Sequence, residues 1–563
     1  MSPRYRTAAE LDTLFAPVRE FQPSPLDWRD QFIYFLLVDR FDDSNSNPPP
    51  YQAGGPQGRD ATQGRCFQGG NLKGITRRLD YIKELGCTTI WLSPILKNRD
   101  QAGSYHGYGT QDFLKVDPHF GTLEDLQELT REAHKRGIYV VLDIVLNHAG
   151  EVFTYGDGLP CYDGSTHPFG HWIEEDQAPG LQANDAVWPE ELQHEEAFKR
   201  KGKICHWENR EEAKNGDFET LKELNLPNPG VLDTLIKVYK YWITAADLDG
   251  FRVDTVKHME NSAMAIFCNA IREYAQRIGK HNFFMFGEIA GNDDLIQQYL
   301  GRNARIEGTS ERFPSLDASL DFPLYYRLES VIKGFTNPAA LRERYDVLHN
   351  NYADHGAAGA YFVTFADNHD RNQRFLHNDP YPQQALLAAA YLLTSQGVPC
   401  LYYGTEQGFD GGGGDDSYVR ECMFGGQWGA FDTTGQHFFN PAAPLYLGIA
   451  GVAAVRATQP ALRYGRQYFR EISGNGRDFG HPLDGRCTLA YSRILDTEEV
   501  LVALNLDSGT RNDCITVDHR LSAPGRTMND LLTGKLYTVE ATEGRAFVRV
   551  ELPTHGVAIL KAQ

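Results

Sequence analysis

Short apolar runs alternate with amphipathic segments along most of the first 400 residues. The run 32–38 (FIYFLLV) carries no charge, which predicts a strand buried on both faces. Apolar residues then recur at helical spacing over 75–85, and Gly86 suits the end of that helix. The same rhythm continues with a strand at 88–92, a helix over 122–137 opened by Thr122 and Asp125, and a strand at 139–145.

Five further apolar segments extend the series of predicted strands. They lie at 250–254, 283–287, 315–322, 361–365 and 399–403. Consecutive strand-then-helix units form parallel strands with right-handed crossovers. Eight such strands favour a (β/α)8 barrel over an open doubly wound sheet.

The rhythm breaks twice, which predicts two additional domains. Residues 149–230 are rich in Gly, Pro, acids and aromatics and lack helical periodicity, so we expect a small domain inserted after the third strand. From residue 466 onward, alternating segments separated by turn residues predict an antiparallel, sandwich-like β-domain over 466–563. The barrel would then comprise residues 1–148 and 231–465.

The charge balance excludes some classes of partner. The chain has 55 Lys and Arg against 75 Asp and Glu, a net charge of −20. Such an acidic protein is a poor binder of nucleic-acid phosphates or anionic membranes, so we expect a neutral or cationic ligand. No apolar stretch approaches the roughly 18 residues that a membrane span requires.

The nine cysteines are scattered singly and never form a CxxC pair. This spacing argues against a zinc site or a disulfide scaffold and favours buried free thiols in a reducing compartment. The N-terminal residues show no secretory h-region, so we expect a cytoplasmic protein, or a secreted one if a signal has been trimmed.

Several reactive side chains stand at the carboxyl ends of the predicted strands, where a barrel of this type carries its active site. Arg252 precedes Asp254 by two residues, so both side chains point to one side of the strand and Arg252 could hold Asp254 ionised by a bidentate hydrogen bond. The candidates at these ends are Asp143, Asn147, His148, Arg252, Asp254, Glu288, Asp367, His369 and Asp370.

Three acids, Asp254, Glu288 and Asp370, end otherwise apolar strands. Any one of them alone would be read more readily as a helix cap. Three acids at three strand ends, each beside Arg or His, are harder to explain in that way, because buried acids need a partner or a task. One anionic and one protonated carboxyl in one cleft are what glycoside hydrolysis requires.

Four segments resemble the conserved regions of the α-amylase superfamily (glycoside hydrolase family 13). They are DIVLNH at 143–148, GFRVDTVKH at 250–258, FGEI at 286–289 and FADNHD at 365–370. Three more resemble its accessory regions: YHGYG at 105–109, LKELN at 221–225 and GVPCLYYGTEQG at 397–408. Together these segments are spread over most of residues 30–430, in the family's order.

The resemblance implies a retaining glycosidase with a role for each acid. Asp254 would be the nucleophile, Glu288 the general acid and base, and Asp370 the residue that holds the 2- and 3-hydroxyls of the distorted sugar. Retention predicts that the carboxyls of Asp254 and Glu288 lie about 5 to 5.5 Å apart. Tyr108 would stack on the sugar or serve as a core aromatic. The other implied substrate-binding residues are His148, Arg252, Lys257, His258 and His369.

Calcium is also implied by the resemblance. Asn147, Glu223 and the backbone carbonyl of His258 would hold it where the insertion meets the barrel, although the family more often has Asp where Glu223 stands. DRFDDSNSN (39–47) with QGGN (68–71) resembles a calcium loop of cyclodextrin-forming relatives, and a solvated Asx-rich turn is the equal alternative. The candidate ligands there are Asp43, Asn45, Asn47, Gly69 and Asn71.

The linkage and the reaction type remain the open questions of the sequence. Thr255 follows the nucleophile, whereas α-1,6-specific relatives tend to have Val there, so we expect α-1,4-linked glucans or maltooligosaccharides. A transglycosidase or an exo-acting α-glucosidase of the same superfamily is the alternative, and a catalytically silent binding subunit is a third. Trp188, Trp207 and Trp428 could stack on further sugars or pack in the core, and Gly411–Gly414 would belong to a mobile loop near the cleft.

Overall fold

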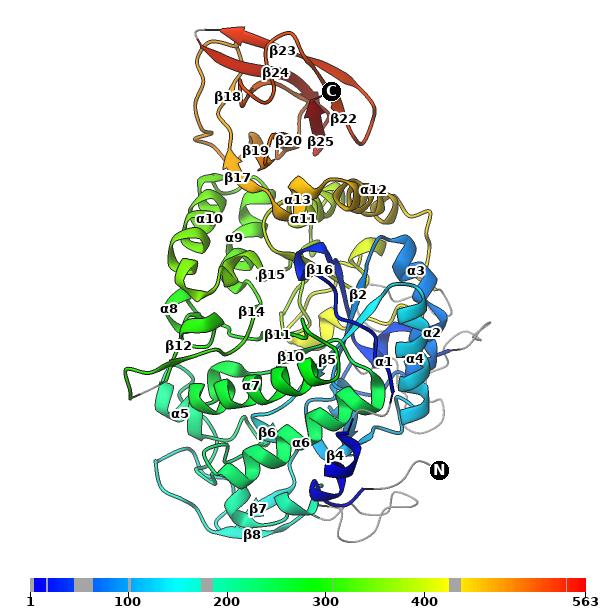
Figure 1. Cartoon of the computed structure of the whole chain (residues 1–563), viewed down its shortest axis with the longest axis vertical. Helices are drawn as coiled ribbons and strands as arrows, with labels where there is room; N and C mark the ends of the chain where they lie inside the picture. Colours follow the sequence, from blue (N-terminus) through cyan, green and yellow to red (C-terminus); the bar gives the residue numbers. More distant parts are fainter. Residues whose placement is uncertain are drawn as a thin grey trace.

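The computed structural model describes residues 5–16, 19–44, 64–99, 103–173, 186–306, 308–424, 437–542 and 544–562. A barrel forms the middle of the molecule, with the insertion and the C-terminal β-domain at opposite ends of the long axis (Figure 1). This arrangement confirms the fold class that the sequence predicts.

Eight parallel strands make up the barrel, in the order β14-β11-β10-β5-β2-β1-β16-β15. A parallel bridge between Leu320, directly after β14, and Val363 of β15 closes the ring. Apart from Tyr139 at the start of β5, the strand residues are buried, because helices cover the outside and side chains fill the inside. Their bounds are β1 (Ile33–Leu36), β2 (Thr89–Leu92), β5 (Tyr139–Ile144), β10 (Gly250–Val253), β11 (Phe284–Gly287), β14 (Ala318–Ser319), β15 (Val363–Thr364) and β16 (Val398–Tyr402).

Helices separate consecutive strands, as the periodicity predicts. Thr122 and Asp125 form a reciprocal capping box at the start of α4. The helix predicted over 75–85 is instead two short helices, because the backbone leaves helical geometry at Arg78. The outer helices are α2 (Leu72–Arg77), α3 (Leu79–Glu84), α4 (Leu123–Lys135), α6 (Pro229–Ala246), α7 (Asn261–Arg277), α9 (Phe322–Ile332), α10 (Ala339–Asn351), α11 (Gln383–Thr394) and α12 (Pro444–Thr458).

The insertion lies over the carboxyl ends of the barrel strands and contains little regular structure. Its strand β9 pairs with β6, which directly follows the third barrel strand, with His148 opposite Glu223. Its elements are β6 (His148–Ala149), β7 (Phe153–Tyr155), β8 (Phe169–Trp172), α5 (Arg210–Asn215) and β9 (Lys222–Glu223).

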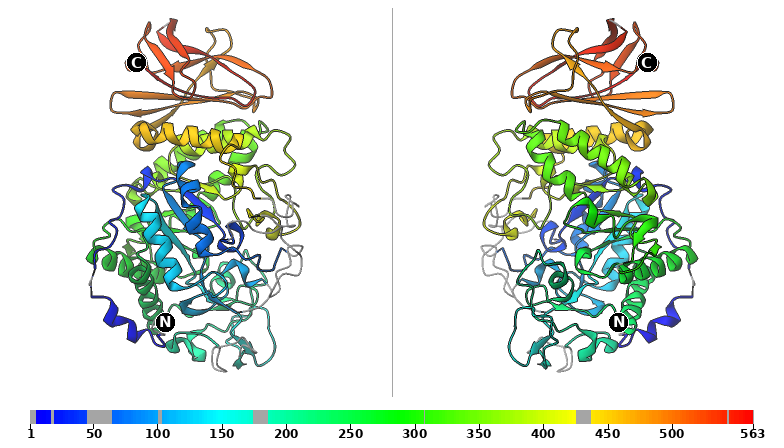
Figure 2. Two further views of the ribbon diagram at one scale, coloured as in Figure 1. Left: turned by 90° about the vertical axis from the view of Figure 1, so that its right-hand side faces the viewer. Right: turned by 90° about the vertical axis from the view of Figure 1, so that its left-hand side faces the viewer.

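The C-terminal domain is an antiparallel nine-stranded sheet that folds over its own apolar core, which includes Leu501, Val548 and Leu560. Helices α12 and α13 (Pro460–Tyr464) lie between it and the barrel (Figure 2). Its strands are β17 (Arg466–Phe469), β18 (Ile472–Ser473), β19 (Thr488–Leu495), β20 (Glu498–Asn505), β21 (Arg511–Val517), β22 (Thr527–Asp530), β23 (Leu536–Thr542), β24 (Arg545–Leu552) and β25 (Val557–Ala562).

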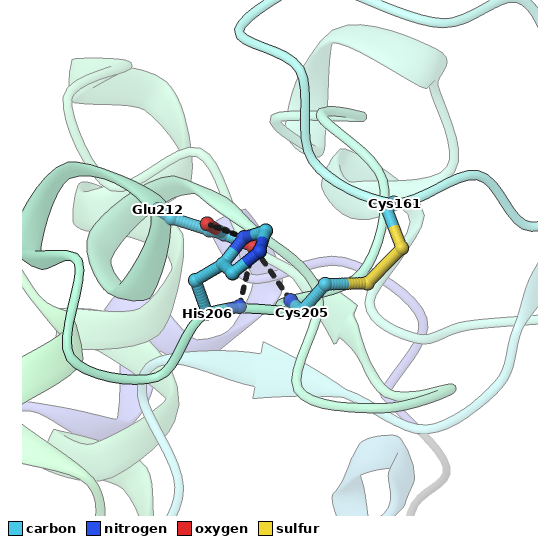
Figure 3. Close-up of a disulfide and its surroundings, with 4 residues drawn as sticks. All are labelled: Cys161, Cys205, His206 and Glu212. Atoms are coloured by element: carbon cyan, nitrogen blue, oxygen red, sulfur yellow. Dashed lines mark hydrogen bonds and ion pairs between the residues drawn. A yellow bond between two sulfur atoms is a disulfide. The ribbon is translucent and has the colours of Figure 1, made fainter.

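The prediction that all cysteines are free thiols is wrong for one pair. Cys161 and Cys205, both in the insertion, form a disulfide with an S–S distance of 2.00 Å (Figure 3). They are 44 residues apart in sequence, so no local spacing indicates the pair. The other seven cysteines are free thiols, and most of them are buried.

No helix among the described residues is long and apolar enough to cross a bilayer.

Candidate active site

The three candidate acids open into one cleft at the carboxyl end of the barrel. Asp254 directly follows β10, Glu288 directly follows β11, and Asp370 lies in the loop after β15. The cleft has a volume of about 590 Å³. Its walls include Tyr108, His148, Trp207, Phe218, Leu221, Asp254, Lys257, His258, Glu288, Asp370, Asp416 and Arg420.

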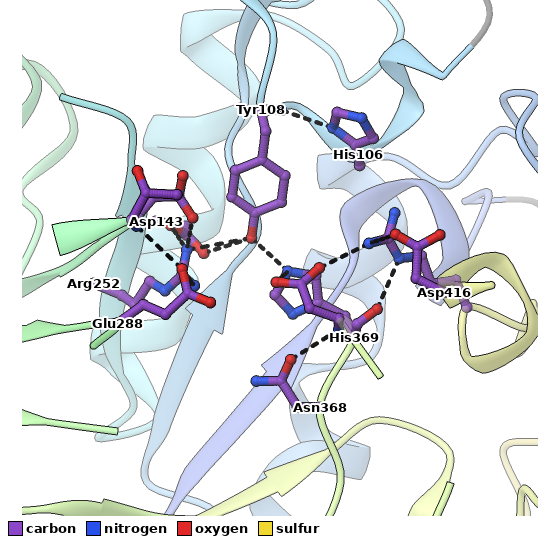
Figure 4. A network of polar contacts seen from close by, with 12 residues as sticks. His106, Tyr108, Asp143, Arg252, Glu288, Asn368, His369 and Asp416 are labelled. Atoms are coloured by element: carbon purple, nitrogen blue, oxygen red, sulfur yellow. Dashed lines mark hydrogen bonds and ion pairs between the residues drawn. The ribbon is translucent and has the colours of Figure 1, made fainter. Parts of the chain in front are cut away.

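Arg252 joins three carboxylates at the floor of this cleft (Figure 4). Its Nη1 donates to Oδ1 of Asp254 at 2.7 Å and to Oδ1 of Asp143 at 2.8 Å. Its Nη2 lies 3.0 Å from Oε2 of Glu288. The predicted bond between Arg252 and Asp254 is therefore confirmed, but the guanidinium is shared among three partners and does not form a bidentate pair with one.

Strand register explains why these groups meet. Arg252 stands opposite Asp143 in the pairing of β10 with β5, and both side chains point into the barrel. The guanidinium is fully buried and remains charged, since arginine is not deprotonated in proteins. It supplies a fixed positive charge where the fold gathers three acids.

Burial and mutual repulsion set the protonation of this cluster. Burial raises the pKa of Asp254 well above its usual range, and although Arg252 lowers it, the carboxylates of Glu288 and Asp143 raise it further. Burial also raises the pKa of Asp143 to about 7, against the opposing effect of Arg252. Asp143 and Asp254, the two aspartates around this cation, therefore hold a proton more readily than free aspartates do, and their titrations are linked. A site that keeps one carboxyl protonated can supply a general acid.

Asp370 faces this cluster from the other side of the cleft. Its Oδ1 accepts a 2.9 Å hydrogen bond from Nη2 of Arg420, and its Oδ2 lies 3.1 Å from Nε2 of His369. Its backbone N–H donates to the side chain of Asn368 at 2.8 Å. These contacts fix the direction of a carboxylate whose side chain is 39% exposed and so accessible to a ligand.

Tyr108 connects the two halves of the site. Its hydroxyl donates to Oδ2 of Asp143 at 3.0 Å and lies 2.8 Å from Nε2 of His369. The tyrosine and histidine rings are stacked, with centroids 5.5 Å apart. Tyr108 thus lines the cleft although most of its side chain is buried, and its stacking on a sugar stays a prediction.

The remaining predicted substrate-binding residues also lie at the cleft. His148 is buried, and Nε2 lies 3.2 Å from the carbonyl oxygen of Tyr108. Burial lowers the pKa of His148 and of His258 to about 4, so both rings are neutral at pH 7. Lys257 and His258, in the turn Val256–His258 (η6), form part of the wall beside Asp254.

Several cleft residues were not found from the sequence. Phe218 and Leu221 come from the insertion, and Arg420 and Asp416 come from the segment after β16. Trp207 lines the cleft, whereas Trp188 is buried against Arg6 away from it, and Trp428 lies outside the described residues. Gly414 does border the cleft, as predicted for its loop.

Glu223, one of the residues predicted to hold calcium beneath the insertion, contacts both Asn147 and the ammonium group of Lys199. Nζ of Lys199 lies 3.4 Å from Oε1 of Glu223, while the Asn147 amide nitrogen donates to Oε2 of that carboxylate at 2.6 Å. The carboxylates of Glu223 and Glu260 outweigh the opposing effect of burial and raise the pKa of Lys199, so it remains a cation. Calcium is bound by six to eight oxygens. A group of oxygens whose centre is already occupied by an ammonium does not fit a calcium ion.

The second predicted calcium loop is described only in part. The amide oxygen of Asn71 caps α2 by accepting from Gly74 N, and its amide nitrogen donates to the carbonyl oxygens of Asp43 and Gly69. Asn45 and Asn47 lie outside the described residues. Among those that are described, no three His, Cys, Asp or Glu side chains are grouped to hold a metal.

Comparison with known proteins identifies the family. The family profile described as "Alpha amylase, catalytic domain" matches residues 35–427. An alpha-amylase of Streptomyces lividans is 31% identical over 90% of this chain and 57% of its own length. A cyclomaltodextrin glucanotransferase of Klebsiella oxytoca is 28% identical over 88% of this chain and 74% of its own.

A solved structure gives the same result. The alpha-amylase from Geobacillus thermoleovorans in complex with acarbose superposes with a TM-score of 0.71 at 26% identity, covering 96% of this chain and 99% of that one. The fold and site define a (β/α)8 barrel protein with three acids in one cleft at the carboxyl ends of its strands. The chain belongs to the α-amylase family, whose members often bind calcium, and it spans 57% of the length of the Streptomyces relative.

Proposed function

We propose that this protein is a retaining glycosidase that cleaves α-1,4-glucosidic bonds in maltooligosaccharides or starch-type glucans. The observation that carries the proposal is the bridge that Arg252 makes between Asp254 and Glu288 on the cleft floor. It holds a nucleophile and an acid from neighbouring strands toward one position, where a scissile bond can lie.

The first step forms a covalent intermediate. A carboxylate oxygen of Asp254 attacks the anomeric carbon while Glu288 gives its proton to the glycosidic oxygen, so the C–O bond breaks and the leaving sugar departs neutral. In the second step, Glu288 takes a proton from water, the water oxygen attacks the anomeric carbon, and the bond to Asp254 breaks. Asp370, held by Arg420, is placed to accept hydrogen bonds from the sugar hydroxyls as the ring distorts.

The walls of the cleft suit a neutral sugar chain. Tyr108, Trp207 and Phe218 offer aromatic surface for the apolar faces of sugar rings, and the acids accept bonds from hydroxyls. A neutral ligand meets no repulsion from a chain with a net charge of −20.

Incubation with maltoheptaose followed by chromatography tests the proposal. We expect shorter products from the native protein and none from Asp254→Asn. The matched control is Asp249→Asn, which removes a buried acid from the opposite end of β10. It should lower stability but leave turnover in place. Undiminished activity of Asp254→Asn would refute the assigned nucleophile.

A transglycosidase is the second candidate, because a relative with 28% identity is named as a glucanotransferase. Both reactions share the intermediate, and only the acceptor differs. Products longer than maltoheptaose would identify a sugar acceptor. A calcium ion at 43–71 and a cytoplasmic location stay predictions.

A further inference from the structure

The ammonium group of Lys199 lies where the insertion meets the barrel. It donates to the carbonyl oxygen of Lys214 at 2.5 Å and to Oε1 of Glu260 at 2.8 Å, and it lies 3.4 Å from Oε1 of Glu223. Its side chain is only 5% exposed. The three N–H donors of the ammonium thus meet three oxygens, two of them from carboxylates.

We propose that Lys199 is the built-in cation of this junction and stands in place of calcium. The oxygens that a calcium ion would need from Glu223 and from its surroundings already accept bonds from the ammonium. A divalent ion beside this group would meet a positive charge in a region shielded from water. The unpaired oxygens nearby, on Asn147 and Glu260, are too few for the six to eight that calcium takes.

The backbone keeps Lys199 in this position. Its N–H donates to the carbonyl oxygen of Glu223 at 3.1 Å, and the preceding residue, Phe198, forms an antiparallel bridge with Leu224. Lys199 therefore lies beside β9. Its backbone binds the backbone of Glu223, and its side chain contacts the carboxylate of the same residue. The backbone pairing thus fixes the start of the side chain beside Glu223, and the bonds to Lys214, Glu223 and Glu260 hold its ammonium there.

The ammonium also links the insertion to the catalytic strand. Lys199, Lys214 and Glu223 belong to the insertion, whereas Glu260 follows η6, the turn that begins two residues after Asp254. Next to Lys214, the carbonyl oxygen of Ala213 lies 2.6 Å from Nδ1 of His258, which lines the cleft. The side chain of Lys199 thus holds the wall of the cleft to the insertion. The stability of this wall should therefore not require calcium.

Thermal unfolding of the full chain with chelator and with calcium tests this inference. In chelator, Lys199→Met should lower the melting temperature by at least about 3 °C, because it leaves the buried carboxylate of Glu223 and the partly buried one of Glu260 without their cation. Lys199→Ala, which also opens space, should gain more from calcium than the wild type does. The matched control is Lys222→Ala, a buried lysine on β9 paired with Asp217 at 3.3 Å, which should gain no more than the wild type.

Two results would overturn the inference. One is an equal effect of calcium on Lys199→Ala, Lys222→Ala and the wild type. The other comes from counting bound calcium by atomic emission after dialysis: a wild type that holds one more ion than Glu223→Gln would place a metal here. The metal count does not depend on the Lys199 variants folding, and neither readout depends on the proposed activity.

Discussion

Arg252 and Asp254 point to the same side of β10, and Nη1 of the arginine lies 2.7 Å from Oδ1 of the aspartate. The arginine is completely buried, so no water competes for this bond. Because Oδ1 is engaged, we expect Oδ2 to be the oxygen that attacks the sugar. The same guanidinium also contacts Glu288, so one side chain fixes the positions of the nucleophile and the acid relative to each other.

Replacement of Arg252 by lysine should therefore impair catalysis more than folding. A lysine ammonium is a point charge and cannot present two nitrogens to three carboxylates in a fixed plane. We expect kcat on maltoheptaose to fall by about 100-fold or more, the size of effect found when a preorganised charge contact is lost.

Arg344→Lys is the matched control for this prediction. Arg344 is also buried, but it pairs with Asp293 and Asp321, which do not line the cleft. It should lower the melting temperature and leave kcat near the wild-type value. An Arg252→Lys enzyme with kcat within a factor of a few of wild type would show that the shared bridge is dispensable.

Glu288→Gln should separate the two halves of the reaction. Without an acid, the departing sugar leaves as an alkoxide, and turnover of maltoheptaose should fall by at least about 1,000-fold. Fluoride needs no proton to leave, so α-maltosyl fluoride should still form the intermediate on Asp254. Mass spectrometry should detect this adduct. If both substrates are lost equally, Glu288 is not the proton donor.

The barrel was predictable because parallel strands buried on both faces read as continuous apolar runs, such as 32–38 and 139–145. The break between α2 and α3 at Arg78 was not predictable. The apolar residues keep their helical spacing through this point, although the backbone leaves helical geometry there. The insertion shows no periodicity because isolated bridges and ion pairs, such as Lys222 with Asp217, stabilise it more than repeating elements do.

The acids of the site were predictable for a related reason: an acid that ends an apolar strand is conspicuous. The i, i+2 spacing also revealed that Arg252 and Asp254 meet. The contacts of Arg420 with Asp370 and of Lys199 with Glu260 join segments 50 and 61 residues apart. Only the folded chain brings these together, and no local pattern marks them.

The buried His369 should make stability depend on pH. Burial, with Arg420 and Arg252 nearby, lowers its pKa well below the usual value, so the folded protein holds the ring neutral. The unfolded chain takes up a proton near pH 6.5, so the stabilisation is present above about 6.5 and is lost as the pH falls toward the folded pKa.

Urea unfolding at about pH 7.5 and pH 5 checks this sign. The free energy of unfolding of His369→Gln should change less between the two pH values than that of the wild type, because glutamine does not titrate. His349→Gln, at an exposed position on α10, should keep the wild-type difference. An unchanged pH dependence in His369→Gln would contradict the buried neutral ring.

The Cys161–Cys205 disulfide should stabilise the insertion and hold Trp207 against the cleft. Cys205 and His206 both donate backbone bonds to Glu212, and Trp207 follows directly. The bond closes a loop of 44 residues, for which chain entropy gives about 4 kcal/mol. Thiol titration of the unfolded, unreduced protein should find seven groups, and nine after reduction.

A double variant, Cys161→Ser with Cys205→Ser, should have a lower melting temperature and a higher KM for maltoheptaose. Its kcat should change little, because Arg252, Asp254 and Glu288 lie on barrel strands or directly after them and Asp370 lies in the loop after β15, so none of them depends on the insertion for its position. Cys268→Ser, at a buried free thiol on α7, is the control for the loss of a sulfur and should leave KM unchanged. If the double variant instead loses kcat while its KM stays unchanged, the insertion orients the catalytic groups themselves. That result would contradict the expectation that the barrel residues alone set kcat and that the insertion affects only substrate binding.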